Sequence, residues 1–554
     1  MDKKMKKYFI AIAASFLFFT ACQNKFLGEQ PIGELTQTQI LDSTNVEGVV
    51  VSAYSVLNGQ FDNASNAYNS PASNWSFGDV VSDDDYKGGG GIGDQNNIDQ
   101  MEIFNTRPSN IDVERKWLAL YEGVRRANTA IQELQKTDKI SQSLKNERIA
   151  EMHFLRGHFF FELKKIYNKI PWIDATASKP SDYLVSNEKY SSSQLWDKIF
   201  NEFKLAENVL PDNQADPGRP TRLAAIAYEC KVDIFRGKWQ EASDLADKVI
   251  SSGKYHLMPN FRDVFLPQND NGPEIIFAIQ SSINDGSPHN YNGGIGDRLA
   301  LPGGPFYPQY GFHRPSQDLV NAFHTDQNGL PVTDHVNVTD SDYVDPRLDY
   351  TVGRPGIPYL DLGVNYEKSW EREVATYGPY APKKRIVSAK SDDYLKVWPY
   401  VNDLNYYVIR YADVLLWKAE AAIELGDLET GRKYINMIRQ RAKNSPTIKT
   451  LDGTKDAAKY KIDTYNQPFT SKTAALTALH LERRLEFAQE GRRFFDLVRW
   501  GIADSVMNAY IKREEGTRTY LQGATFVKGK NEYFPIPQSQ IDLSNGLIKQ
   551  NPGY

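Results

Sequence analysis

The chain has 554 residues, of which 40% are hydrophobic and 24% are charged, so its composition is that of a folded globular protein. Its 65 Lys and Arg against 70 Asp and Glu give a net charge of −5, which excludes a broad basic surface for nucleic acid. A mean hydropathy of −0.54 also excludes a polytopic membrane protein.

The N-terminus has the pattern of a bacterial export signal. Four lysines within residues 3–7 precede a mostly apolar run, Tyr8 to Ala21, which at about 14 residues is shorter than the roughly 20 needed to span a bilayer. An uncleaved anchor is the alternative. The sequence Phe19-Thr20-Ala21-Cys22 resembles a lipobox, so we expect residues 1–21 to be removed and Cys22 to carry the lipid.

Helical periodicity dominates the first half of the chain after this leader. A first helix is predicted over 38–60, and residues 63–110, rich in Asn, Asp, Ser and Gly, are predicted to be loop rather than core. Further helices are predicted from 113 onward and over 149–166, 195–210, 223–235 and 239–250. Cys230 lies within one of these helices, where a buried, inert thiol is expected.

Two helical hairpins share a spacing pattern. Gly237 and Gly426 each end one helix, and a small residue follows five positions later, Ala242 or Gly431. This spacing resembles the turn and second helix of a tetratricopeptide unit, although generic hairpins can mimic it. The copies lie 189 positions apart, which predicts a large insert between them.

The insert, residues 261–407, has little helical period beyond 316–323. Short strands are plausible at 275–279 and 386–387, and the rest is predicted to be an ordered, loop-built half packed on the helices. Helices then return over 411–425, 428–442, 474–490 and 494–510.

Several motifs, in order along the chain, resemble the SusD/RagB family of outer-membrane nutrient-binding lipoproteins of Bacteroidota. They are Gly218-Arg219-Pro220-Thr221, the segments Arg410–Ala421, Tyr434–Ala442 and Glu482–Gly501, and the closing Phe534–Gln538 and Gln550–Tyr554. With the lipobox, they span essentially the whole chain.

The resemblance implies a mainly α fold in which tetratricopeptide-like helix pairs form a scaffold and the loop-rich insert carries a few short strands. It divides the mature chain at about residue 260, into 22–260 and 261–554. It implies a lipid-anchored protein of the outer membrane, facing the cell exterior, which captures an oligosaccharide and delivers it to a SusC-type TonB-dependent transporter. Binding of peptides is the alternative within the family, and a scaffold that uses its helical grooves for protein partners is a third hypothesis. No cofactor, metal or nucleic-acid partner and no catalysis are expected.

The insert and the early loop are rich in aromatic residues. An aromatic ring offers a flat apolar face to a sugar or a peptide side chain, while polar neighbours orient the hydroxyl groups. The candidate ligand-binding residues are Trp75, Asp84, Tyr86, Tyr291, Tyr307, Tyr310, Phe312, Trp370 and Trp398. For any one ring, packing of the insert against the helices is the competing interpretation.

Acidic residues provide little support for an enzyme. Glu486 and Glu490 lie among arginines, which would depress their pKa values, so a structural ion-pair network is expected there. A glycosidase would need two carboxylates facing one cleft, and the only loop acids worth testing are Asp83, Asp84, Asp361 and Glu367. The run Asp83–Asp85, with Asp94, is predicted to be a solvated acidic loop, with bound calcium as the less favoured alternative.

Overall fold

A computed structural model describes residues 43–61 and 67–554. The predicted export signal, Cys22 and the start of the first predicted helix lie outside these ranges. The described part is mainly helical with a few short strands, as expected from the sequence. None of its helices is long and apolar enough to cross a membrane.

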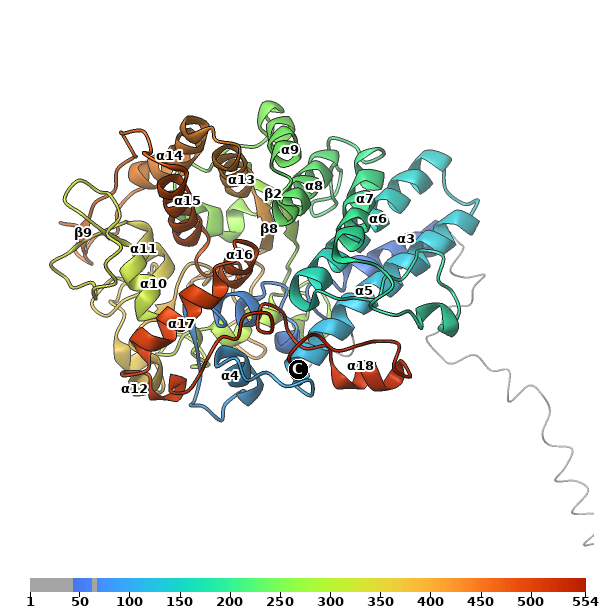
Figure 1. Cartoon of the computed structure of the whole chain (residues 1–554). Coiled ribbons are helices and arrows are strands. Elements are labelled where there is room, and N and C mark those ends of the chain that lie inside the picture. The colour runs from blue at the N-terminus through green and yellow to red at the C-terminus, as the bar shows by residue number, and fades with distance from the viewer. Residues whose placement is uncertain (1–42, 62–66) are drawn as a thin grey trace, which may run out of the picture.

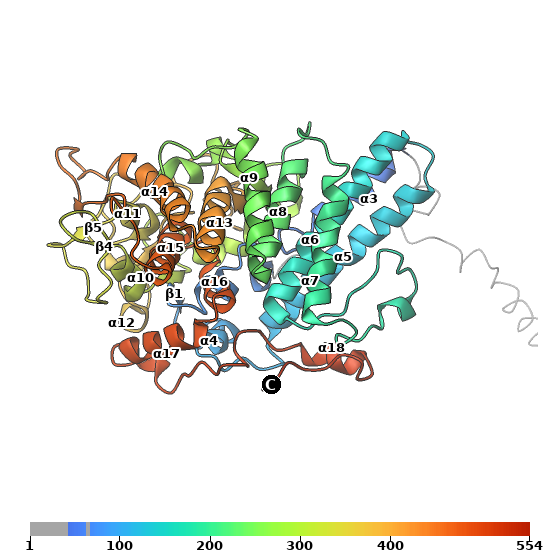
Figure 2. The ribbon, with the colours of Figure 1, turned by 45° about the horizontal axis from the view of Figure 1, so that its top comes forward.

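The long helices stand side by side in one row (Figures 1 and 2). Along the row, each helix packs against the next, from α5 through α6, α7, α8 and α9 to α13, α14 and α15, and α3 packs on α5. The bounds are α3 Ser43–Tyr54, α5 Ile111–Lys136, α6 Gln142–Tyr167, α7 Ser192–Glu207, α8 Arg222–Arg236, α9 Trp239–Ser251, α13 Tyr411–Glu424, α14 Leu428–Asn444 and α15 Lys472–Phe487. The contact between α9 and α13 brings the two predicted hairpins together across the insert.

Both hairpins have the predicted turn. Gly237 and Gly426 follow the first helix with φ of 67° and 93°, a backbone conformation that glycine adopts at little cost. A Cβ at Gly431 would lie 2.3 Å from Ile423 Cγ1, so only glycine lets α13 and α14 approach this closely. The small-residue spacing therefore has a packing cause.

The insert is closed at its base by a strand pair. Strand β2, Ile275–Ile279, pairs antiparallel with β8, Tyr406–Arg410, so the two ends of the insert lie together beside the helices. The strand predicted at 275–279 is confirmed, whereas Ile386 and Val387 are buried without forming a strand. The apolar run at 386–387 was a core signal rather than a strand signal.

The other strands within or next to the insert are short. They form three small sheets, β1–β3, β4–β5–β9 and β6–β7. The bounds are β1 Asp85–Gly88, β3 Phe312–Pro315, β4 His324–Thr325, β5 Tyr343–Val344, β6 Val352–Gly353, β7 Ala381–Pro382 and β9 Lys459–Tyr460, with helices α10 Gln317–Ala322, α11 Arg347–Thr351 and α12 Val374–Tyr377 between them. Most of the insert is thus irregular, as predicted.

The helix predicted over 494–510 is two helices. Helix α16, Arg493–Arg499, ends before Gly501, whose φ is 70°, and α17, Ala503–Glu514, begins after it. From α17 to α18 (Gln538–Leu543), the chain runs along one edge of the molecule (Figure 2). Helix α4 (Asn96–Glu102), from the early segment, lies at the same edge. The apolar periodicity continued across the break, which hid the turn.

The early loop is core, contrary to the prediction. Residues 73–89 are buried throughout, and the acidic run in them is not solvated. The Asp83 carboxylate binds Arg493 Nε at 2.8 Å and Nη2 at 2.9 Å, and Asp84 Oδ1 binds Arg484 Nε at 2.6 Å. These arginines lie about 400 positions away in the sequence, so local composition could not reveal the pairing.

Glu486 and Glu490 belong to a buried ion-pair network, as predicted. Burial alone would raise the pKa of Glu486, but Arg441, Arg410 and Arg347 outweigh it and lower the pKa to about 2. Among the described residues, the network joins six cations to six carboxylates: Arg347, Lys384, Arg410, Arg439, Arg441 and Arg492 with Glu274, Asp345, Asp413, Glu482, Glu486 and Glu490. It ties α15 to α13, α14 and the insert.

Candidate functional site

Six of the nine candidate ligand-binding side chains are buried and serve the interior. They are Trp75, Asp84, Tyr86, Tyr307, Phe312 and Trp370. Two of them make internal hydrogen bonds: Trp75 Nε1 donates to the Gly296 carbonyl at 3.0 Å, and Tyr86 Oη donates to Glu514 Oε2 at 2.7 Å. In this structure they offer no face to a ligand, because the irregular half of the protein needs large rings to fill its core.

The other three candidates reach the surface. Trp398 is 55% exposed, and Tyr291 and Tyr310 are half-buried. The ring of Tyr310 packs edge-on to that of Tyr400, with centroids 6.3 Å apart. Trp398 is therefore the largest accessible aromatic surface among the predicted residues.

An exposed histidine lies between two of these rings. The His289 ring centroid is 5.3 Å from that of Tyr291 and 5.3 Å from that of Trp398. We call His289, Tyr291 and Trp398 the surface aromatic cluster. The sequence analysis missed His289, although its position two residues before Tyr291 in a Ser-, Asn- and Gly-rich loop was a usable signal.

A small apolar core holds this cluster in place. Ile295 and Val401 are buried at its centre, and Ile283, Tyr291 and Leu395 pack around them. A backbone hydrogen bond joins the two loops that carry the rings, since the Gly294 amide donates to the Asn402 carbonyl at 3.0 Å. Within the loop of Trp398, the Leu395 amide donates to the Val401 carbonyl at 2.9 Å. The rings are thus displayed on braced loops.

The loop that carries His289 and Tyr291 also carries a group of hydrogen-bonded polar side chains. The exposed carboxylate of Asp285 accepts hydrogen bonds from Ser282 Oγ at 2.5 Å, from the Ser287 amide at 2.9 Å and from Asn292 Nδ2 at 2.7 Å. These bonds, the one from Ser282 above all, lower the pKa of Asp285 well below its usual value. A fixed carboxylate and neighbouring amides beside aromatic faces can bind and orient sugar hydroxyl groups.

A cleft of about 320 Å³ adjoins the same loop. It is lined by Asn292 and Gln280 on the insert side and by Tyr54, Asn58 and Arg219 on the scaffold side, among others. Arg219 bonds to Glu47, to Glu151 at 2.7 Å and to Asp216 at 3.0 Å, so its charge is already balanced. The cleft gives the aromatic cluster a concave neighbour of ligand-binding size.

Two larger hollows lie elsewhere. One, of about 480 Å³, is lined by Arg262, Lys383, Lys390 and Asp361. The other, of about 740 Å³, lies along the segment 463–471 and the start of α15. Among the proposed catalytic acids, Asp361 borders the first hollow and Glu367 is exposed, while Asp83 and Asp84 are buried against arginines. This arrangement brings no two of them into one cleft.

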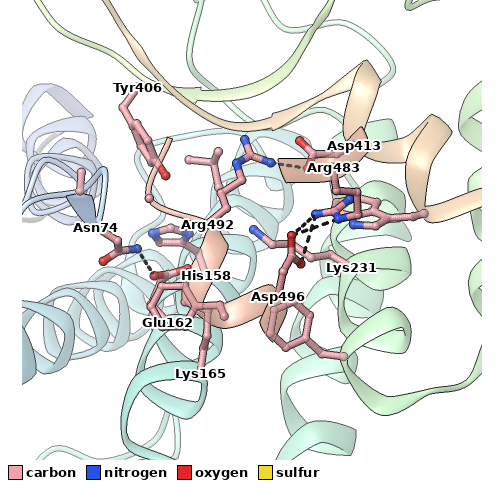
Figure 3. A pocket seen from close by; sticks show the side chains of 16 residues that line it. Asn74, His158, Glu162, Lys165, Lys231, Tyr406, Asp413, Arg483, Arg492 and Asp496 are labelled. Carbon is pink, nitrogen blue, oxygen red and sulfur yellow. Dashed lines mark hydrogen bonds and ion pairs between the residues drawn. The ribbon is translucent and has the colours of Figure 1, made fainter. Parts of the chain in front are cut away.

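A small polar cavity lies among the scaffold helices (Figure 3). Its volume is about 50 Å³, and side chains from α6, α8 and α13 line it together with residues 491–496. Burial lowers the pKa of His158 to about 3 and that of Lys231 to about 7, while Glu162 accepts from Asn74 Nδ2 at 2.8 Å and from Lys165 Nζ at 2.7 Å. Since one water occupies about 30 Å³, this cavity has room for water and none for a sugar ring.

Comparison with known proteins covers nearly the whole chain. A model described as the SusD family matches residues 273–554, and one described as "Starch-binding associating with outer membrane" matches residues 25–234. A SusD-like protein of Bacteroides ovatus is 24% identical to this chain, over 97% of this chain and 94% of the relative.

Solved structures share the fold. The crystal structure of a SusD superfamily protein from Bacteroides vulgatus superimposes with a TM-score of 0.72 at 24% identity, over 93% of this chain and 99% of the other. Surface glycan-binding protein A from Bacteroides thetaiotaomicron, solved in complex with laminarihexaose, gives a TM-score of 0.69 at 20% identity, over 92% of this chain and 99% of that one. Because the family model alone matches half of the sequence and the fold agrees over nearly all of it, this chain belongs to the SusD family.

Proposed function

We propose that this protein is a glycan-binding protein without catalytic activity, which captures an oligosaccharide on the surface aromatic cluster and the adjoining cleft. The observation that carries the proposal is the exposure of Trp398 beside His289 and Tyr291. The loops that carry these rings pack on a small apolar core, and one of them also carries the hydrogen-bonded Asp285 and Asn292. A sugar ring that stacks on the indole leaves its hydroxyl groups for these neighbours. The binding of laminarihexaose by a structurally similar protein supports a carbohydrate as the ligand class.

We infer the membrane anchor and the transporter partner from membership of the family. The protein is proposed to be anchored in the outer membrane through a lipid on Cys22, to face the cell exterior and to pass its ligand to a SusC-type TonB-dependent transporter. Substitution Cys22→Ala should abolish labelling by radioactive palmitate and move the protein from the membrane to the soluble fraction. The proposed pairing with a transporter is tested by co-purification, without added crosslinker, of the lipidated chain with the SusC-type transporter encoded by the neighbouring gene.

Calorimetry tests ligand capture directly. The chain without residues 1–22 is titrated with laminarihexaose, with matched malto-, cello- and xylo-oligosaccharides and with short peptides. For a sugar that binds, Trp398→Ala should weaken the affinity at least tenfold, which corresponds to about 1.4 kcal/mol. Trp398→Phe should retain most of the affinity, because it keeps a ring face.

Val397→Ala is the matched control, since Val397 is 67% exposed next to Trp398 and has no ring. It should change the affinity less than twofold. Unchanged binding in Trp398→Ala would refute the proposed site, and binding of peptides alone would refute the glycan class. Release of shorter sugars during the titration would refute the absence of catalysis.

A further inference from the structure

Three buried groups converge where the early segment meets the insert. Asp79 ends the short helical turn Trp75–Asp79, Asp85 begins β1, and His313 lies on β3, the antiparallel partner of β1. One carboxylate oxygen from each aspartate and one ring nitrogen of His313 all lie within 4.8 Å of one another. All three residues are buried, so this site is separate from the surface aromatic cluster.

The separations suit a shared ion. His313 Nε2 lies 3.0 Å from Asp79 Oδ2 and 3.7 Å from Asp85 Oδ2. Ligand atoms held about 2.1 Å from one metal ion, at tetrahedral or octahedral angles, lie roughly 3.0 to 3.4 Å apart. The two separations that involve His313 are therefore close to those of ligands on one ion, and the third lies within 4.8 Å.

One of these oxygens has no partner. Asp85 Oδ2 accepts no hydrogen bond from any residue that the structure describes, although Asp85 is 0% exposed. The other oxygen of Asp85 accepts from Gln489 Nε2, which leaves Oδ2 facing His313. A buried carboxylate oxygen without a donor is costly unless something else occupies the position beside it.

Neither Asp79 nor Asp85 pairs with an arginine or a lysine among the described residues. Asp83 and Asp84 each have an arginine, as described above. Within the described part of the chain, both Asp79 and Asp85 form their ion pair with His313. Asp79 also accepts hydrogen bonds from the backbone amides of Gly491 and Arg492. Two buried carboxylates thus share one imidazole, and a divalent cation would neutralise both.

A cavity of about 40 Å³ borders this group and is lined in part by His313, Gln489, Ser73 and Trp75. It has room for one water, which can supply a further ligand. Two carboxylate oxygens, one imidazole nitrogen and a water form a ligand set that suits zinc and related transition ions, since calcium and magnesium prefer oxygen ligands alone.

We propose that Asp79, Asp85 and His313 bind one divalent transition-metal ion of the Zn²⁺ type, which fastens the early segment and the insert to each other next to the scaffold loop at Gln489–Arg492. The ion has a structural role. It joins two segments that are remote in sequence, the early one with Asp79 and Asp85 and the insert with His313, so its binding energy adds to the stability of the folded protein.

Metal analysis of the full chain tests the site. The protein is unfolded in guanidinium with EDTA, refolded with or without ZnCl₂, dialysed and measured by mass spectrometry. The refolded protein should hold about one zinc per chain and should melt several degrees higher than the metal-free form. Refolding with Co²⁺ should give visible d–d absorption bands, a measurement that needs no variant.

Asp85→Asn is the decisive variant, because asparagine can still accept from Gln489 but is a poor metal ligand. It should fold, hold less than 0.1 zinc and melt at the same temperature with and without ZnCl₂. Asp112→Asn is the matched control. Asp112 is 1% exposed, and within residues 43–61 and 67–554 its Oδ2 has no partner and no histidine bonds to the residue. It should keep the zinc response. Wild-type protein that binds no zinc or cobalt after refolding would overturn the proposal and leave a plain histidine–carboxylate hydrogen bond.

Discussion

Removal of one arginine from the buried ion-pair network should destabilise the protein severely. Arg410 is 0% exposed, and its Nη1 lies 2.6 Å from Glu274 Oε1 and 3.1 Å from Glu486 Oε1, while its Nη2 lies 2.8 Å from Glu490 Oε1. In Arg410→Met the side chain still fills much of the same space. The six carboxylates of the network then face five cations, so one buried negative charge is uncompensated.

The magnitude follows from these distances. At about 3 Å and an effective dielectric constant of about 20, the Coulomb attraction of each pair is roughly 5 kcal/mol. The free-energy cost of removing both charges from water offsets most of this attraction. Loss of one partner of a buried pair costs about 3 to 5 kcal/mol net. We expect Arg410→Met to lower the free energy of unfolding by that amount.

Guanidinium unfolding followed by circular dichroism measures this difference. The control is Arg125→Met, in which an arginine that is 53% exposed loses its pair with Glu122 on the same helix. An exposed pair of this kind is worth at most about 0.5 kcal/mol. If Arg410→Met costs as little as Arg125→Met, the network does not stabilise the fold as argued. Adding Glu490→Gln should recover part of the loss, because it removes an uncompensated carboxylate.

Three further predictions concern stability and reactivity. Glu486 and Asp496 have a folded-state pKa of about 2, below that of an unfolded carboxyl. Their contribution to the free energy of unfolding is therefore present above about pH 4.5 and should fall as the pH drops towards 2. Coincident guanidinium unfolding curves at pH 7, 4 and 3 would contradict this. Gly431→Ala should cost about 1 to 2 kcal/mol, because the clash with Ile423 exceeds the gain in helix propensity, and a higher midpoint in guanidinium would refute the close contact. Cys230 is 0% exposed and burial raises its thiol pKa, so it should react with a thiol reagent only in denaturant; fast reaction of the native protein would show that the scaffold opens there.

Local spacing carried the prediction of the scaffold. Helices α8, α9, α13 and α14 lie within a few residues of their predicted ranges, because an apolar stripe of period 3.6 and a glycine at the turn are local signals. The ion-pair role of Glu486 and Glu490 was predictable from the charges around them, but most of their partners were not: Glu486 pairs with Arg347, Arg410 and Arg441, all remote in sequence. The two errors at 386–387 and at Gly501 arose where an apolar pattern does not distinguish core loop, strand and broken helix.

The candidate site was predictable only in part. Composition pointed to aromatic residues of the insert, but a buried ring and a displayed ring have the same side chain. Tyr307 fills the core, whereas Trp398 lies on the surface, and only the packing of the neighbouring loops separates them. His289 became a candidate only because the fold places it between Tyr291 and Trp398.

The sequence by itself determined the helical scaffold, the repeat and the family, because these depend on residues a few positions apart or on motifs read in order. The tertiary structure decided which aromatic rings reach solvent, which arginines neutralise Asp83 and Asp84, and that Asp79 and Asp85 meet His313. Burial and charge balance are set by partners that can lie about 400 residues away, and no local pattern specifies them.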